Sequence, residues 1–172
     1  FLIKMPKQEK KAAKGLEILG KKLVADIDQG RNPSIEFSLR SLSNVVYDTK
    51  SKTLTLGEKQ QQRTFFNVGH AKKFMQTLEV AKVGKTLLDV GKHASLRDVF
   101  YMAKRTLPNS SINIVDDQAE SDKALEDLEL ITDCSREQLN INANKMGSVA
   151  GNVVIEDAGD TINWAKLGSG GW

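Results

Sequence analysis

Cysteine is nearly absent from this 172-residue sequence, and long apolar runs are absent altogether. The single cysteine, Cys134, cannot form an internal disulfide, which excludes the disulfide-stapled scaffolds of small secreted proteins. No run of about 18 apolar residues occurs, so no transmembrane helix is expected. The basic segment 1–14 lacks the apolar region of a signal peptide, and because the sequence starts at Phe1 we expect the natural N-terminus upstream. These absences predict a protein of the reducing cytoplasm with no membrane partner.

Charge is present in both signs but is unevenly distributed along the chain. Residues 1–110 hold 21 Lys and Arg against 10 Asp and Glu, whereas residues 111–172 hold 4 against 12. A basic half suits a polyanion partner, because each cation placed near a phosphate releases counterions. An ordinary mixed and solvated surface would give the same composition, so charge alone leaves both interpretations open.

The first part of the chain reads as a basic helix followed by a β-hairpin. A helix is predicted from Lys4 to Ile27, because apolar residues recur at steps of three and four. That stripe consists of Leu16, Leu19, Leu23 and Ile27. Two short β-type runs, 44–47 and 53–56, flank a loop and predict a hairpin.

The second part predicts four helices and a further hairpin. One helix should run over 69–90 with Gly91 as its C-cap, and Ser95 with Asp98 should cap the next, which Pro108 and Asn109 should end. Helices from Ser121 to Thr132 and from Ser135 to Ile141, three residues apart, match a helix-turn-helix. A hairpin built from 147–155 and 161–164 follows, which is the order of a winged helix.

The predicted fold class is therefore α+β, mostly helical. Its main unit is a winged helix, which consists of a helix-turn-helix and a β-hairpin wing, preceded by a helical and hairpin extension. We expect an N-terminal extension over residues 1–67, a winged-helix unit over 68–165, and the start of a linker over 166–172.

The most informative segment is the helix that carries Tyr101. At about 100° per residue, Tyr101 falls about 140° from Leu96, outside the apolar stripe of this helix. Arg97 and Arg105 lie one turn before and after it, with Lys104 nearby. A tyrosine phenol ordinarily has a pKa near 10. Nearby cations favour its ionised form, the phenolate, and can also bind a phosphate. The pattern indicates a nucleophile for phosphate chemistry, although a surface tyrosine covering arginine side chains would have the same spacing.

Four segments carry a resemblance to a known family. They are Ser95-Leu-Arg-Asp-Val-Phe-Tyr101, Ser38-Leu-Arg-Ser-Leu-Ser-Asn-Val45, the run from Asn67 to Thr77, and Asn144-Lys-Met-Gly-Ser-Val-Ala-Gly151. Together they resemble the A subunit of the archaeal type IIB topoisomerase, topoisomerase VI, and its relative the meiotic double-strand-break transesterase. The resemblance covers about residue 35 to the end. Met146 adds a residue between lysine and glycine in the last segment.

The resemblance implies roles for individual residues. Tyr101, the second aromatic of its pair after Phe100, would be the nucleophile, with Arg97 catalytic and Asp98 supporting. Lys104, Arg105, Arg136 and Lys145 are expected to bind DNA. The acidic pairs 116–117 and 156–157 show no defensible ligand geometry, so no metal is assigned to this chain.

The resemblance also implies partners and cofactors. It implies a CAP-like winged helix, followed after a linker such as Lys166 to Trp172 by a Toprim domain that carries Mg²⁺. Two A subunits would form a homodimer on double-stranded DNA, because two tyrosines cut two strands. A B subunit that binds ATP would complete a heterotetramer and dock on the N-terminal part of A. The apolar stripe at 16–27 would be either the surface for this docking or a plain core contact within the chain. Such a complex would be associated with the nucleoid.

The competing function is a non-enzymatic winged-helix DNA-binding protein. It would place the predicted helix from Arg136 to Asn142 in the major groove, although that helix carries one cation and lies in the acidic half. Covalent attachment of DNA to the protein would separate the two functions.

Overall fold

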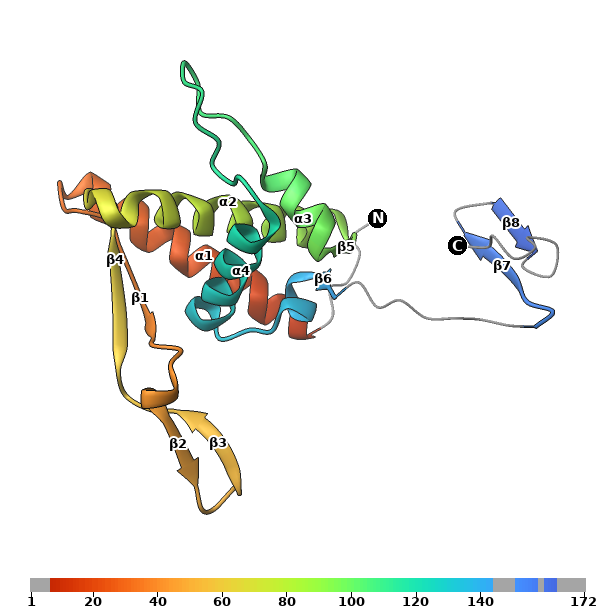
Figure 1. The fold of residues 1–172 in the computed structure, drawn as a ribbon, viewed down its shortest axis with the longest axis horizontal. Coiled ribbons are helices and arrows are strands. Elements are labelled where there is room, and N and C mark those ends of the chain that lie inside the picture. Colours follow the sequence, from red (N-terminus) through yellow and green to blue (C-terminus); the bar gives the residue numbers. More distant parts are fainter. Residues whose placement is uncertain (1–6, 144–150, 158–159, 164–172) are drawn as a thin grey trace.

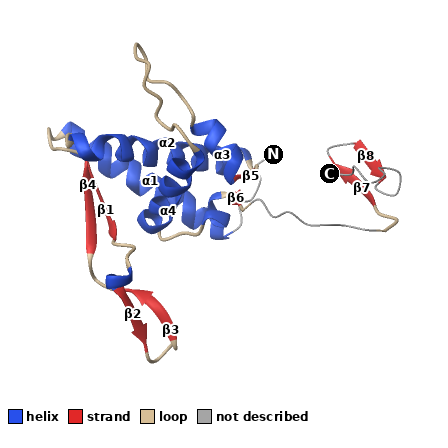
Figure 2. Ribbon diagram, in the orientation of Figure 1, coloured by secondary structure: helices blue, strands red, loops and turns tan. Residues whose placement is uncertain are grey.

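The computed structural model describes residues 7–143, 151–157 and 160–163, and its main feature is a helical body with a strand-built arm (Figures 1 and 2). The elements of the N-terminal part are α1 (Lys7–Asp28), β1 (Ser34–Ser38), η1 (Leu42–Asn44), β2 (Val45–Asp48), β3 (Thr53–Leu56) and β4 (Gln60–Thr64). The elements that follow are α2 (Val68–Val90), β5 (Ala94–Ser95), α3 (Leu96–Ala103), α4 (Gln118–Thr132), η2 (Arg136–Leu139), β6 (Ile141–Asn142), β7 (Val154–Asp157) and β8 (Asp160–Asn163). The expected α+β class is confirmed, and helices make up about half of the described residues rather than most of them.

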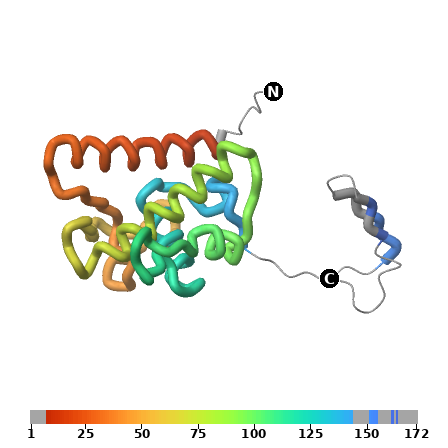
Figure 3. Tube along the Cα trace, turned by 90° about the horizontal axis from the view of Figure 1, so that it is seen from above, coloured from red at the N-terminus to blue at the C-terminus, as the bar shows by residue number. Residues whose placement is uncertain are grey.

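Helix α1 runs along one edge of the helical body (Figure 3). Leu16, Leu19 and Leu23 are each 7% exposed and belong to the hydrophobic core. Ile27, in the last turn, is 62% exposed. The three leucines therefore form an intramolecular core contact rather than a surface for a partner. Ile27 lies outside this core contact.

Helices α1 and α4 approach closely at one glycine. A β-carbon added to Gly15 would lie 3.1 Å from Cβ and 3.3 Å from the carbonyl oxygen of Thr132, which is buried near the end of α4. The absence of a side chain at Gly15 thus sets the distance between the two helices. The N-terminal segment and the later helices consequently share one core.

The arm consists of two antiparallel strand pairs, β1 with β4 and β2 with β3. The β2–β3 hairpin was predicted, whereas β1 and β4 were not. Buried Asn44 holds the two pairs together, since its amide donates to the carbonyl oxygens of Leu39 at 2.8 Å and Lys59 at 3.1 Å. Its side-chain oxygen accepts from the backbone N–H of Lys59 at 3.0 Å.

Local signals place the boundaries of α2 and α4. Helix α2 begins after Asn67, whose side chain accepts from the Gly69 N–H, and ends at Gly91, which has the predicted left-handed conformation with φ of 64°. Helix α4 begins at Gln118 rather than Ser121, because Asp117 caps it by accepting from the Glu120 N–H. Helix α4 packs mainly on α2 and also contacts α1, α3 and β1.

The predicted helix-turn-helix of residues 121–132 and 135–141 is wrong. The capping box of Ser135 and Gln138 is present, but it opens only the single 3-10 turn η2, which ends at Asn140 with φ of 59°. The chain then enters β6, which pairs in parallel with β5. The competing function consequently has no α-helix at Arg136 to Asn142 to place in a groove.

A C-terminal hairpin is confirmed, but with shifted bounds, because β7 begins only at Val154 and continues to Asp157. Strands β7 and β8 pair antiparallel, with Val154 opposite Asn163. The part of the prediction on residues 147–150, and the linker 166–172, lie outside the described residues. Within the described ranges, no helix has the length and apolarity needed to cross a membrane.

Candidate functional site

The candidate site is built on α3, a helix of eight residues with a strong N-terminal cap. The Ser95 hydroxyl donates to Asp98 at 2.7 Å and accepts from the Asp98 N–H at 3.2 Å. The Ser95 N–H also donates to the Asp98 carboxylate at 3.0 Å, which completes the predicted capping box. The hydrogen bond from the Ser95 hydroxyl holds the pKa of Asp98 below its ordinary value. Asp98 therefore supports the helix that carries Tyr101.

The face of α3 that packs on the body is separate from the face that carries the candidate residues. Val99 is 1% exposed and Ala103 is fully buried, whereas Tyr101 is 56% exposed. Helix α3 contacts both α2 and α4. Packing of the buried face fixes the orientation of the helix, so the Tyr101 side chain points away from the core as predicted.

Arg97 and Tyr101 meet on the exposed face. Nη2 of Arg97 donates to the phenolic oxygen of Tyr101 at 3.4 Å, and the guanidinium carbon lies 5.8 Å from the ring centroid. The hydrogen bond to the phenolic oxygen raises the pKa of Arg97. The pair thus sets a cation with further donors beside an accessible oxygen, which is the arrangement expected at a site that receives a phosphate.

A second cation lies close by. The ammonium nitrogen of Lys104 is 5.5 Å from the Phe100 ring centroid, and the Phe100 ring lies 5.1 Å from the Tyr101 ring. Lys104 is the C-cap of α3 and is exposed. The structure therefore brings Arg97 and Lys104 to the aromatic pair from opposite ends of the helix.

Arg105 does not take the helical position beside Tyr101 that the sequence suggested. Helix α3 ends at Ala103 rather than at Pro108, and Nη2 of Arg105 pairs instead with Glu79 of α2 at 3.3 Å. The Glu79 side chain is 9% exposed and also binds Lys82 at 3.0 Å. Sequence reasoning missed Glu79 because its partner lies 26 residues away.

The remaining predicted DNA-binding residues lie apart from this cluster or outside the described residues. Nε of Arg136 donates to Glu129 at 3.0 Å, its Nη2 donates to the same carboxylate at 3.1 Å, and its side chain is 25% exposed. This hydrogen-bonded pairing occupies the guanidinium within the chain. Lys145 falls in the segment 144–150, which lies outside the described residues.

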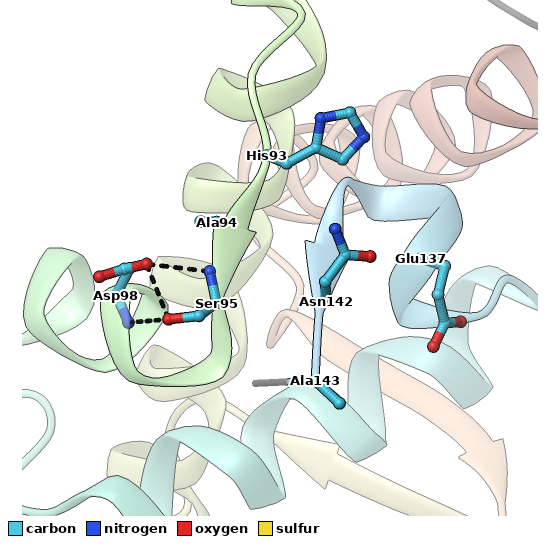
Figure 4. Close-up of a pocket in the computed structure, with 7 residues that line it drawn as sticks. All are labelled: His93, Ala94, Ser95, Asp98, Glu137, Asn142 and Ala143. Carbon is cyan, nitrogen blue, oxygen red and sulfur yellow. Dashed lines mark hydrogen bonds between the residues drawn. The ribbon is translucent and has the colours of Figure 1, made fainter. Parts of the chain in front are cut away.

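A cavity of about 520 Å³ opens at the N-terminal end of α3 (Figure 4). It lies where β5 and β6 pair, and it is lined by His93, Ala94, Ser95, Asp98, Glu137, Asn142 and Ala143. No sequence pattern indicated this cavity, because the segment that forms β6 was predicted to be part of a helix. Its charged lining residues, Asp98 and Glu137, are both acidic, and among the described residues no three His, Cys, Asp or Glu side chains gather as a metal site. The described residues therefore do not fit a Mg²⁺ ion.

Comparison with known proteins gives the site its context. The profile of the family described as "Type IIB DNA topoisomerase" matches residues 72–141, which include all of α3. The chain is 43% identical over 94% of its length to the A subunit of type 2 DNA topoisomerase 6 from Pyrococcus horikoshii. The chain belongs to the family of the type IIB DNA topoisomerase A subunit.

More distant relatives of the type IIB A subunit also match most of the chain. The A subunit of type 2 DNA topoisomerase 6 from Aeropyrum pernix is 35% identical over 91% of the chain. The A3 subunit of DNA topoisomerase 6 from Oryza sativa subsp. indica is 32% identical over 83% of it. The chain spans about two fifths of the length of the archaeal relatives, at 42% and 43% for the two named here.

Proposed function

We propose that this chain is the DNA-binding and DNA-cleaving part of a type IIB topoisomerase A subunit, with Tyr101 as the nucleophile. The observation that carries the proposal is the Arg97–Tyr101 pair at 3.4 Å on the exposed face of α3. The pair lies inside the segment matched by the family profile. Phe100 and Asp98 complete the local motif, respectively as the ring beside Tyr101 and as the cap of its helix.

The proposed step is a transesterification that conserves the number of phosphoester bonds. The phenolic oxygen of Tyr101 attacks a DNA phosphorus and forms a phosphotyrosyl bond, and the bond from phosphorus to a deoxyribose oxygen breaks. The phenolic proton passes to solvent and the released sugar oxygen takes one up, so the balance closes without an oxidant or reductant. Attack by that sugar oxygen reverses the step and reseals the strand.

The role proposed for Arg97 follows from its geometry and charge. Its guanidinium stays protonated and reaches the phenolic oxygen, so its other N–H groups can bind the oxygens of the attacked phosphate. Lys104 adds a second positive charge beside the aromatic pair.

The order of elements around α3 supports a winged-helix arrangement different from the predicted one. Helix α2, strand β5, helix α3, helix α4 and strand β6 follow one another, β5 and β6 pair, and the hairpin β7–β8 comes later in the chain. In such an arrangement α3 and α4 would take the places of the two helices of the helix-turn-helix, with the segment 104–117 in place of its short turn. Acidic side chains are frequent on α4, so we propose that DNA is held through α3 and its flanking segments.

The wider assembly belongs to the same proposal. A homodimer would supply one tyrosine for each strand of double-stranded DNA, and a B subunit would supply ATP binding. Mg²⁺ would be held by a Toprim domain, since the described residues of this chain do not gather its ligands. No step proposed for Tyr101 or Arg97 is routed through that ion.

The test is covalent capture of DNA by matched tyrosine variants. The A subunit that contains this chain is combined with its B subunit, Mg²⁺, ATP and end-labelled duplex, and protein-linked DNA is counted after denaturation. Tyr47→Phe is the control, because Tyr47 is also 56% exposed but lies in β2. We expect Tyr101→Phe to abolish the adduct while duplex binding changes little, and Tyr47→Phe to retain both.

Two outcomes would contradict the assignment. One is a covalent adduct that persists in Tyr101→Phe, and the other is an adduct that maps to Tyr47. Retained duplex binding by Tyr101→Phe shows that a lost adduct reflects chemistry rather than unfolding.

A further inference from the structure

The segment that follows the tyrosine helix carries positive charge and no negative charge. Between Asp98 and Asp116 the sequence contains no acidic residue, whereas Lys104 and Arg105 lie at the start of the loop. Helix α4, which comes directly afterwards, is rich in acidic residues. The loop of residues 104–115 therefore separates the candidate site from the acidic part of the chain. Arg105 is paired with Glu79, so the charge complementary to a polyanion is that of exposed Lys104.

This 104–115 loop is anchored at its base. Ile114 and Val115 are buried, at 3% and 0% exposure. The Ile114 N–H donates to the Arg105 carbonyl at 2.8 Å, and Gln76 of α2 donates to the Ile114 carbonyl at 2.9 Å. Because both ends are fixed on α2 and α3, the loop projects from the body in a defined position (Figure 1).

The loop is also ordered along its length by its own hydrogen bonds. Leu107 N–H donates to the Ile112 carbonyl at 2.9 Å, and Thr106 and Asn113 are bridged, with their side chains 2.8 Å apart. Ser110 N–H donates to the Leu107 carbonyl at 3.2 Å, which closes a turn over Pro108 and Asn109. Asn109 has φ of 59°, as the third position of a type II turn requires. Binding through this loop would consequently cost little ordering entropy.

The tip presents uncharged hydrogen-bonding groups to solvent. Asn109, Ser110 and Ser111 are exposed, and Ile112 beside them is 58% exposed. Hydroxyl and amide side chains commonly contact DNA phosphates and sugars. An amide can also read the minor-groove edge, and an isoleucine can press against base steps there.

Distance along the chain keeps the tip near Tyr101. Two helical residues and six extended ones separate Tyr101 from Asn109, so their Cα atoms lie at most about 24 Å apart. One turn of B-DNA extends about 34 Å. A duplex that has a phosphate at Tyr101 and runs along the side of the loop would therefore meet the tip within one turn.

We propose that the 104–115 loop is a DNA contact that binds the duplex within one helical turn of the phosphate held at Tyr101. Lys104 at its base neutralises backbone charge, and Asn109 and Ser111 at its tip bond to phosphate and minor-groove oxygens. The inference rests on the proposed function in taking Tyr101 as the point where DNA lies.

The first test measures duplex affinity against salt by fluorescence anisotropy, with the 172-residue chain and a labelled duplex of about 30 base pairs. The variant Asn109→Gly with Ser111→Ala removes both tip side chains, and glycine accepts the positive φ at residue 109. We expect affinity to fall about tenfold, as for two lost hydrogen bonds. The slope of log affinity against log salt concentration should not change. Lys104→Ala should instead lower the slope by about one, and Thr49→Ala, an exposed hydroxyl in the β2–β3 loop, should change neither.

Unchanged affinity in the tip variant, or a loss that Thr49→Ala reproduces, would overturn the proposal. The second test places a thiol-linked photocrosslinker on Ser111→Cys, while native Cys134 is buried and stays unlabelled. In the complete complex we expect crosslinks within about ten base pairs of the nucleotide joined to Tyr101. Normal cleavage without such crosslinks would refute the loop contact alone. Absence of any Tyr101 adduct with the tip effect retained would refute the nucleophile alone.

Discussion

Arg97 is the residue whose surroundings define the candidate chemistry. Its neighbour in sequence, Asp98, is engaged by both the hydroxyl and the N–H of Ser95 in the capping box. The hydrogen bond from Arg97 goes instead to Tyr101, one turn further along α3. Asp98 thus supports the start of the helix through the capping box, and the Arg97 guanidinium points toward the phenolic oxygen of Tyr101.

The first residue-scale prediction separates a catalytic Arg97 from a structural one. Removing a donor to a charged transition state typically costs about a hundredfold to a thousandfold in rate, so Arg97→Ala should lose that much cleavage while a long duplex still binds. Arg97→Lys should recover only part, because an ammonium cannot grip a phosphate with two parallel hydrogen bonds. Cleavage and melting temperature are measured on the same preparations.

A structural role for Arg97 would give a different pair of results. Melting temperature would fall, and cleavage would decline only in proportion to the folded fraction. Normal cleavage per folded molecule in Arg97→Ala would therefore end the catalytic interpretation.

At the scale of elements, the close approach of α1 to α4 decides how the N-terminal helix sits on the body. Gly15 faces Thr132, whose hydroxyl donates to the Leu128 carbonyl at 2.8 Å and whose side chain is buried. Gly20, on the same helix, has nothing within 4 Å of the position of an added β-carbon. The two glycines therefore form a matched pair for measuring the packing of α1.

Alanine at these two positions should change stability in opposite directions. Gly20→Ala should stabilise the protein by roughly 0.5–1 kcal/mol, because alanine is the better helix former. Gly15→Ala should destabilise it by about 1 kcal/mol, since Thr132 cannot retreat without moving α4. Urea denaturation of both variants checks this, and equal stabilisation by both would mean that the helices do not pack as described.

At the scale of the whole molecule, the two oppositely charged halves of the sequence pair with each other inside the fold. Acidic residues of 111–172 bind cations of 1–110 in several places, namely Lys72 with Asp116 and Glu120, Arg40 with Glu126, Arg63 with Asp127, and Lys11 with Asp133. Part of the basic half is thus neutralised internally. The excess of cations in the basic half consequently overstates the positively charged surface that remains for DNA.

One of these pairs is buried and joins the arm to the helical body. Arg63 in β4 donates to Asp127 in α4 at 2.6 Å, with side chains 6% and 7% exposed, and its guanidinium lies 4.8 Å from the Phe37 ring centroid in β1. A buried charge is tolerated only while its oppositely charged partner is also present. The pair therefore couples folding of the arm to folding of α4.

Removing one partner should cost more than removing both. Asp127→Leu leaves a buried guanidinium and should lower the free energy of unfolding by about 3–5 kcal/mol, whereas Asp127→Leu with Arg63→Met should recover most of that loss. Chemical denaturation of the single and double variants is the measurement. A double variant as unstable as the single one would show that the pair contributes packing rather than charge compensation.

Much of the helical framework was predictable because its signals act within a few residues. Ser95 and Asp98 cap α3, and Gly91 ends α2 in the left-handed conformation, since each bond involved closes over three to five residues. The β2–β3 hairpin joins neighbours in sequence. The exposure of Tyr101 likewise follows from helical periodicity once α3 exists.

Tertiary structure alone decided the features whose stabilising partners are distant in sequence. Strands β1 and β4 carry mostly polar residues and become strands by pairing with each other, with β1 packed on α4 and β4 on α2. The segment after Ser135 has a helix cap, yet pairing with β5 makes it a 3-10 turn followed by β6. Arg105 joins Lys82 at the nearly buried carboxylate of Glu79, and only the packing of α3 on α2 brings Arg105 and Glu79 together. Local hydrogen bonds join residues that are close together in the sequence and can be predicted from it, whereas these contacts form only after the chain has folded.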